Sequence, residues 1–73
     1  MKKVFKLEDL DCANCAAKME AAIRSIEGVT NATVSYMRQS LTLEADDTRF
    51  DAILEKAAAV CRKIEPDCRI LMK

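Results

Sequence analysis

Hydrophobic and polar positions follow two different periods along the chain, and each change of period marks the end of an element. Residues 3–8 alternate with a period of two, with Phe5 and Leu7 on one side, which predicts a half-buried strand. Between residues 16 and 26 the apolar positions recur at helical spacing instead. Gly28 follows where a glycine commonly ends a helix, so a strand and a helix are expected in that order.

The middle of the chain predicts a hairpin. Residues 29–36 alternate again, with Ala32, Val34 and Tyr36 on one face, and Leu41 and Leu43 continue the alternation. The short segment 37–40 between these runs has the length of a hairpin loop. We therefore expect two antiparallel strands joined by a tight turn.

A second helix is predicted to open at residues 46–48 and to end at Glu65. Thr48 and Asp51 fit a capping box, in which side chains bond the free N–H groups of the first turn. Pro66 ends the helix because helical backbone is disfavoured before a proline. The apolar stripe of this helix comprises Phe50, Ile53, Leu54, Ala57, Cys61 and Ile64. Residues 68–72 then alternate as a short last strand.

The predicted order is strand, helix, strand, strand, helix, strand, which is the split βαβ motif of the ferredoxin-like fold. With right-handed crossovers this order gives an α+β sandwich, a four-stranded antiparallel sheet with both helices on one face. We expect residues 1–73 to form a single domain of this kind. Three loops should then share one end of the fold, at residues 9–15, 37–39 and 64–68.

Composition narrows the possible functions. Twelve basic residues balance twelve acidic ones and aromatic residues make up 4%, so the chain offers neither a basic surface nor a stacking platform for nucleic acid. No apolar run approaches the ~20 residues of a membrane span, and no signal peptide is evident, so we expect a cytoplasmic protein without direct membrane insertion. A core of this size also argues against a self-sufficient enzyme with a buried cofactor.

The chain has four cysteines and no histidine. In a small cytoplasmic domain, cysteines indicate metal ligands or redox groups before they indicate disulfides. Histidine is the commonest neutral metal ligand and the usual general base. A metal site in this chain must therefore be built from sulfur and carboxylate.

Cys12 and Cys15 carry the main chemical signal. Two residues separate them on the loop that enters the first helix, so both can bind one ion. Cys15 lies at or near the predicted helix N-terminus, where the helix dipole favours the thiolate. Thiolates prefer soft or borderline metals. Dithiol redox chemistry uses the same motif at a helix N-terminus and stays open as an alternative.

The sequence around this loop resembles the heavy-metal-associated domain family, which includes copper chaperones and the N-terminal metal-binding domains of heavy-metal P-type ATPases. The resemblance rests on LDCANCAAKME at residues 10–20 and IEGV at residues 26–29, and it extends to KIEPD at residues 63–67. The family pattern GMxCxxC has Asp9 and Leu10 here in place of glycine and methionine. The resemblance implies the ferredoxin-like fold, metal binding by Cys12 and Cys15, and no catalytic role for the domain alone.

Within the family, Asp11 before Cys12 and the run CANCAA resemble the zinc, cadmium and lead transporters more than the copper ones. Zn(II) takes about four ligands and accepts carboxylate oxygen as well as sulfur. Asp11 is thus a candidate third ligand, and the alternative is a solvated loop carboxylate. Glu65 and its neighbours stand where copper-binding members often carry lysine or tyrosine.

The resemblance also implies cargo and partners. The expected cargo is Zn(II), Cd(II) or Pb(II), with Cu(I) as the alternative. The expected partner is the transmembrane part of the same or another heavy-metal ATPase, to which the ion passes by ligand exchange. A free-standing copper(I) chaperone and a dithiol redox protein are the alternative functions.

Cys61 and Cys68 are expected at the same end of the fold as Cys12 and Cys15. They could complete a four-thiolate site, as in a structural zinc domain, or form a second thiol pair. Both fall on inward-facing positions of their elements, and free cysteine is among the most buried residue types. We therefore favour core roles for them and keep them only as auxiliary ligand candidates.

Overall fold

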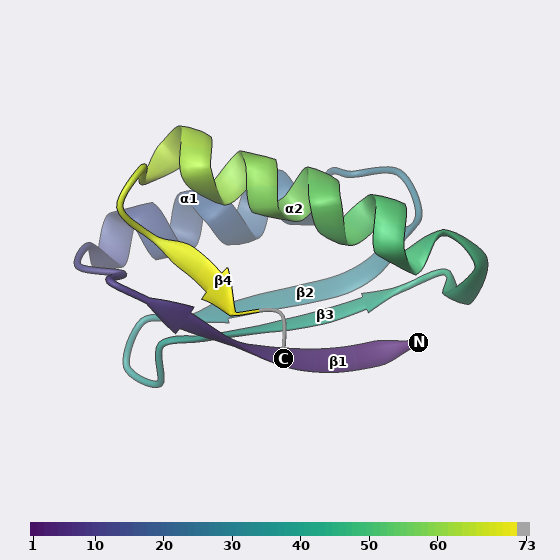
Figure 1. Ribbon diagram of the computed structural model, residues 1–73, viewed down its shortest axis with the longest axis horizontal. Coiled ribbons are helices and arrows are strands. Elements are labelled where there is room, and N and C mark those ends of the chain that lie inside the picture. Colours follow the sequence, from purple (N-terminus) through teal and green to yellow (C-terminus); the bar gives the residue numbers. More distant parts are fainter. Residues whose placement is uncertain (72–73) are drawn as a thin grey trace.

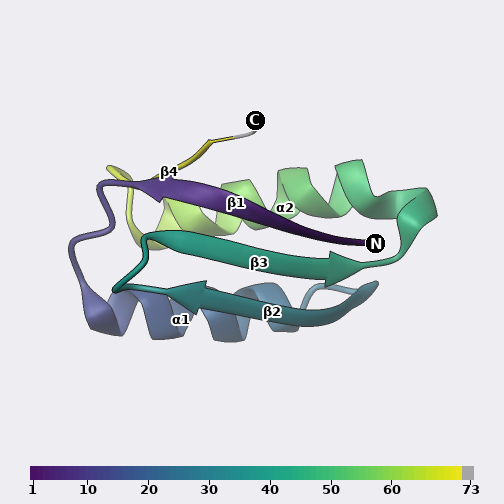
Figure 2. The same cartoon turned by 90° about the horizontal axis from the view of Figure 1, so that it is seen from below.

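The computed structural model describes residues 1–71. Its elements are β1 (Lys2–Glu8), α1 (Ala13–Arg24), β2 (Val29–Ser35), β3 (Ser40–Ala45), the 3-10 turn η1 (Asp47–Arg49), α2 (Phe50–Ile64) and β4 (Arg69–Leu71). The strands form one antiparallel sheet in the order β2-β3-β1-β4, and both helices lie on one of its faces (Figures 1 and 2). The predicted α+β, ferredoxin-like architecture is confirmed.

The core lies between the sheet and the two helices. Phe5 and Leu7 of β1 are buried while their neighbours in the strand are exposed, as the alternation predicts. From α1, Met19 and Ile23 reach the same layer and are fully buried. Phe50 at the start of α2 stacks on Phe5 with ring centroids 6.4 Å apart. Burial of one face of each element therefore accounts for the layering.

The first helix begins at Ala13, earlier than the period predicts, and ends at Arg24. Its first turn presents Ala13 and Asn14 to solvent, so no buried residue marks it in the hydrophobic pattern. Gly28 has a φ of 96°, which is the left-handed conformation expected of a glycine shortly after a helix end.

The capping box predicted at Thr48 and Asp51 is wrong. Asp46 caps this segment instead, because its carboxylate accepts hydrogen bonds from the Thr48 N–H at 3.1 Å and the Thr48 hydroxyl at 3.0 Å. These bonds form the 3-10 turn η1, and α2 begins only at Phe50. The sequence therefore predicts the position of a helical N-terminus at residues 46–48, but the capping residue is Asp46 rather than Thr48.

Two strand ends also differ from the prediction. β2 ends at Ser35, so Tyr36 belongs to the hairpin turn and is 38% exposed rather than on the inner face. The last strand spans Arg69–Leu71 within the predicted 68–72, and Met72 lies outside the described residues.

The three loops predicted to meet do share one end of the sheet, away from the N-terminus (Figures 1 and 2). The Leu7 N–H donates to the carbonyl of Gln39 at 2.7 Å, which joins the end of β1 to the β2–β3 turn. Among residues 1–71, neither helix is both long and apolar enough to cross a membrane.

Candidate metal site

The predicted ligands Cys12 and Cys15 lie at the start of α1. Cys12 is the N-cap residue, with extended backbone, and its Sγ accepts a hydrogen bond from the Cys15 N–H at 3.2 Å. A side-chain acceptor at this position satisfies one of the free N–H groups of the first helical turn. Both side chains are free thiols and both are half-buried. The loop thus holds two sulfur atoms side by side within reach of solvent.

The two thiols differ in acidity because they hydrogen-bond each other. The bond from the Cys15 thiol, followed by the bond from the Cys15 N–H, lowers the pKa of Cys12. The same thiol–thiol bond raises the pKa of Cys15 to about 11, and burial adds to this effect. Cys12 is therefore the first of the pair to become a thiolate. A soft cation that replaces the remaining proton would be held by both sulfur atoms.

Two carboxylates flank this pair in different ways. Asp11 is exposed, and its charge acts on Cys68, where it contributes to a raised pKa. Glu65 is half-buried directly after α2, and its charge contributes to a higher pKa of both Cys12 and Cys15. Hydrogen bonding toward the Glu65 carboxylate is the smallest of the effects that raise the pKa of Cys15. Within residues 1–71, no three Cys, Asp or Glu side chains already surround a metal position, so a third ligand must turn toward the thiols.

The sequence predicts that the loop with Glu65 shares one end of the fold with the cysteine loop, but it does not single out Glu65 as a ligand. The end of α2 is far from the cysteine loop along the chain, and only the fold brings them together. The Glu65 backbone is fixed there, because its N–H donates to the Cys61 carbonyl at 2.8 Å and its carbonyl accepts from the Cys68 N–H at 3.0 Å. The following Pro66 favours the extended backbone that turns Glu65 out of the helix.

The backbone before Cys12 has an uncommon conformation. Asp9 has a φ of 63°, in the left-handed region that glycine adopts without penalty. Aspartate tolerates this region better than most residues, at a cost of about 1 kcal/mol. Leu10 is 2% exposed and fills the core at the position of the family's methionine. Asp9 therefore adopts a backbone conformation typical of glycine, which is the family's residue at this position.

Cys61 and Cys68 lie in the core, 1% and 0% exposed. Burial, with a smaller effect from the charge of Cys68, raises the pKa of Cys61 to about 11. Burial also raises the pKa of Cys68, and the charges of nearby carboxylates, Glu65 first among them, add to the effect. The raised pKa does not separate this pair from Cys15, whose pKa is also about 11, but the lack of solvent access does, because an ion from solution cannot reach a thiol inside the core. These features support the core interpretation of both residues.

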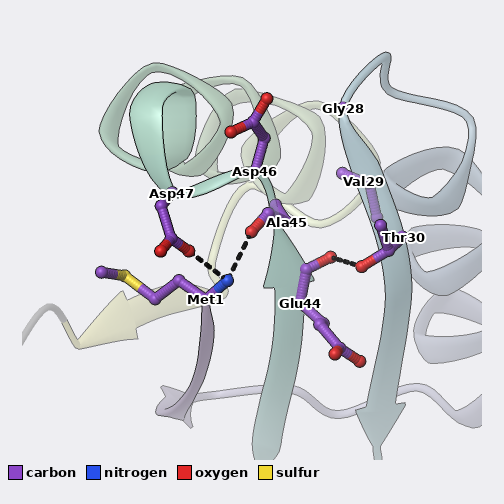
Figure 3. A pocket seen from close by; sticks show the side chains of 8 residues that line it. All are labelled: Met1, Gly28, Val29, Thr30, Glu44, Ala45, Asp46 and Asp47. Atoms are coloured by element: carbon purple, nitrogen blue, oxygen red, sulfur yellow. Dashed lines mark hydrogen bonds and ion pairs between the residues drawn. The ribbon is translucent and has the colours of Figure 1, made fainter.

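Two of the surface hollows lie at opposite ends of the fold. One of about 430 Å³ lies beside the cysteine loop and is lined by Asp9, Asp11, Arg62, Pro66, Asp67 and Arg69, so arginines offset part of the negative charge there. The other, of about 690 Å³, lies at the opposite end (Figure 3). There the Met1 amino group pairs with Asp47 and donates to the Ala45 carbonyl at 2.8 Å. That second hollow contains no thiol and has no part in the metal site.

A known protein family and several individual proteins resemble this chain. Residues 4–65 match the family described as "HMA: Heavy-metal-associated domain". The "Cadmium, zinc and cobalt-transporting ATPase" of Bacillus subtilis (strain 168) is 29% identical over 73 residues, which is 100% of this chain and 10% of that protein. The chain thus spans about a tenth of the length of this curated relative.

Two solved structures share the fold. The N-terminal domain of a potential copper-translocating P-type ATPase from Bacillus subtilis, solved in the Cu(I)-loaded state, has a TM-score of 0.74 and 28% identity, over 94% of this chain and 84% of that one. A CopZ metallochaperone has a TM-score of 0.76 over 97% of this chain and 100% of that one, but only 18% identity, so this likeness concerns the fold alone. Proteins named for cadmium and zinc and proteins named for copper are both among the relatives.

Proposed function

This chain belongs to the heavy-metal-associated domain family, a family of metal-binding modules, and from that premise we propose that it binds one Zn(II), Cd(II) or Pb(II) ion and passes it on by ligand exchange. One observation carries this proposal. The thiols of Cys12 and Cys15 lie side by side and half-exposed at the N-terminus of α1. Such a pair neutralises a divalent ion and stays open to a second protein.

Ligand exchange follows from this exposure. A closed four-ligand site resists exchange, whereas an open one lets an incoming ligand bind before an existing ligand leaves. A thiolate or carboxylate of the partner joins the ion first, and then Cys12 or Cys15 dissociates from it. The released sulfur takes up a proton or returns to the thiol–thiol hydrogen bond that the metal-free site contains. The ion is thereby transferred without ever being free in water.

We propose a carboxylate as the third ligand, because it distinguishes divalent ions from copper. Carboxylate oxygen bonds Zn(II) readily but adds little to Cu(I), which two thiolates already satisfy. Asp11 is the residue that the sequence favours, since it adjoins Cys12 and is exposed enough to turn toward the ion. Glu65 is the second candidate, because its half-buried carboxylate is close enough to both thiols to raise the pKa of each.

In its cellular setting we propose that the chain is the N-terminal, cytoplasmic domain of a heavy-metal-exporting P-type ATPase. It would deliver its ion to the transmembrane part of the same or another such ATPase, and ATP hydrolysis would belong to that larger protein. The relative that matches over the whole chain supports this setting. A free-standing Cu(I) chaperone is the second candidate, because the copper chaperone CopZ of Staphylococcus aureus (strain JH9) is 27% identical over 48 residues, which is 66% of this chain and 71% of that protein.

Titration of the reduced protein with Zn(II), Cd(II) and Cu(I) in the presence of a pH indicator tests the proposal. We expect about one divalent ion per chain, with proton release, because the ligating thiols must lose their protons. Cys12→Ser is the control and should abolish tight binding. Absence of binding by the reduced protein would favour the dithiol redox alternative, and a strong preference for Cu(I) over both divalent ions would favour the copper chaperone.

A further inference from the structure

We propose that Gln39 is a positioning residue for the metal site, because its side-chain amide holds the backbone that leads into Cys12. This inference rests on the proposed function of Cys12 and Cys15. Gln39 ends the turn between β2 and β3, which reaches the same end of the fold as the cysteine loop (Figures 1 and 2). The predicted topology brings these two segments to one end of the fold, and the hydrogen bonds between them show how Gln39 contacts the cysteine loop.

The Gln39 side chain pairs with both polar backbone groups of Leu10. Its Nε2 donates to the Leu10 carbonyl at 2.7 Å, and its Oε1 accepts from the Leu10 N–H at 3.0 Å. Nε2 also donates to the carbonyl of Tyr36 at 2.8 Å, within its own turn. Among side chains, only an amide offers this combination of two donors and an acceptor in one plane. The match indicates a specific role for glutamine here.

This pairing continues the sheet beyond the point where its strands end. The ladder between β1 and β3 runs to Lys6 and Ser40, and the Leu7 N–H still donates to the Gln39 carbonyl at 2.7 Å. After that the chain turns away through Asp9, and the Gln39 amide takes the place of a neighbouring strand for Leu10. The hairpin turn and the cysteine loop are thereby tied into one unit.

The unit formed by the hairpin turn and the cysteine loop contains two residues with strained backbone. Within residues 1–71, the non-glycine residues with positive φ are Asp9 at 63° and Gln39 at 52°. Residues persist in this region only where surrounding contacts hold them there. The contacts in question are the Gln39 amide on the backbone of Leu10 and the burial of the Leu10 side chain, which is 2% exposed.

Loss of this support would weaken metal binding without removing any ligand. Cys12 follows Leu10 closely, so a mobile Leu10 lets the Cys12 sulfur leave its place beside Cys15 for part of the time. The apparent dissociation constant then rises by the inverse of the fraction of molecules that keep the binding geometry. Groups that hold metal ligands in place typically contribute roughly 10–100-fold to affinity.

Two variants of Gln39 test this role. Gln39→Met keeps the length of the side chain and removes its three hydrogen bonds, and Gln39→Glu keeps an acceptor for the Leu10 N–H but loses both donors. We expect each to weaken Cd(II) binding about tenfold at unchanged stoichiometry. We also expect faster hydrogen exchange of the Leu10 N–H in the metal-free Gln39→Met protein. Either variant alone suffices if the other fails to fold.

Two controls separate positioning from stability. Ser35→Ala removes a hydrogen bond of the same turn, from the Arg38 N–H to the Ser35 hydroxyl at 3.2 Å, without affecting the cysteine loop. Its Cd(II) affinity should equal that of the wild type. Ile53→Val removes a buried methyl group from the core beside Gly28, at the opposite end of the fold, so it should lower stability and also leave Cd(II) affinity unchanged.

Three results would overturn the positioning role. These are wild-type Cd(II) affinity in both Gln39 variants, unchanged exchange of the Leu10 N–H, and an affinity loss that Ile53→Val reproduces at the same melting temperature. A wild-type protein that does not bind Cd(II), or that binds it equally well after Cys12→Ser, would refute the proposed function itself and the positioning role with it. Measurement of wild type and Cys12→Ser alongside the Gln39 variants distinguishes these two failures.

Discussion

The chain carries two pairs of cysteines, and the fold gives them opposite surroundings. Cys12 and Cys15 are half-buried at the start of α1, where their sulfur atoms share a hydrogen bond. Cys61 in α2 and Cys68 just before β4 are 1% and 0% exposed. The side chains are chemically identical, so the difference between a ligand and a core residue comes from solvent access and hydrogen bonding alone.

Backbone position explains this contrast. The start of α1 offers free N–H groups and the positive end of a helix dipole, both of which favour a thiolate. Cys61 lies in the last turn of α2, where carbonyl groups face outward and the dipole disfavours negative charge. Cys12, the N-cap residue with the lowered pKa, is therefore suited to bind a cation, whereas Cys61 is suited to remain neutral.

The largest expected effect separates the pairs by metal affinity. Cys12→Ser and Cys15→Ser should each lower Cd(II) affinity by more than about 100-fold, because a directly bound thiolate contributes more than the groups that merely orient it. Cys61→Ala and Cys68→Ala should stay within a few-fold of the wild type. Competition titration against a chelator of known affinity measures all four. A comparable loss in the second pair would indicate a structural site with four thiolates, and a chelator should then unfold the protein.

Substitutions in the buried pair should lower the free energy of unfolding more than substitutions in the half-exposed pair. Cys61→Ala and Cys68→Ala each remove a buried sulfur and leave a small cavity, at a cost of about 1–2 kcal/mol. Thermal unfolding of the metal-free protein, followed by circular dichroism, should record a melting temperature lower by roughly 4–8 °C per kcal/mol. Cys12→Ser should unfold near the wild-type temperature, because serine is itself a favourable N-cap. If substitutions in both pairs lowered the melting temperature equally, the distinction between a half-exposed ligand pair and a buried core pair would be wrong.

Alkaline pH should destabilise the fold through the buried pair. The pKa of Cys61 rises from its ordinary value of 9.0 to about 11 in the folded chain. Between these values the unfolded chain loses a proton that the folded chain keeps, so stability falls as the pH rises. The contribution is complete below pH 9.0 and is lost as the pH approaches about 11.

Urea unfolding at several pH values between 8 and 10.5 checks this expectation. The wild type should lose about 1 kcal/mol by pH 10 through Cys61. Cys61→Ala should lose less over the same window, since it lacks the titrating thiol. The two proteins differ only at residue 61, so the difference between the two curves reports the Cys61 thiol. Identical curves would mean that burial does not hold the Cys61 proton.

Repetition made most of the fold predictable. A strand or helix with one buried face places its hydrophobic residues at regular intervals, so the sequence predicts it, as Phe5 and Leu7 predict β1. The first turn of α1 was missed because its residues face solvent. The η1 turn was missed because it depends on a single carboxylate, that of Asp46, which competes with the expected capping box. Local hydrogen bonds of this kind leave no periodic trace.

The site was predictable only in its local part. The spacing of Cys12 and Cys15 predicts their place at a helix start, which the structure confirms. Their role as ligands, and that of Asp11, stays a prediction. Glu65 and Gln39 reach the cysteine loop only through the topology of the sheet, and topology shows which loops meet without showing which side chains touch.

The smallest expected effect concerns the third ligand, a carboxylate that we propose joins Cys12 and Cys15 on the ion. If Asp11 is a ligand, Asp11→Ala should weaken Zn(II) and Cd(II) binding and leave Cu(I) binding nearly intact. If Glu65 is the ligand, Glu65→Ala should do so instead. A true ligand should contribute more than the ~0–1 kcal/mol of an exposed charge pair, which is more than about fivefold in affinity.

Charge balance explains why Cu(I) should not respond. Two thiolates neutralise a divalent ion, so a carboxylate brings the site to a charge of −1. With Cu(I) the two thiolates alone already reach −1, and a third anion would be repelled. Asp67→Ala is the matched control, since Asp67 is an exposed carboxylate in the hollow beside Asp11. If Asp67→Ala weakens binding as much as Asp11→Ala and Glu65→Ala, these carboxylates act only through long-range charge, and the preference for divalent ions must then arise from the thiols and their surroundings.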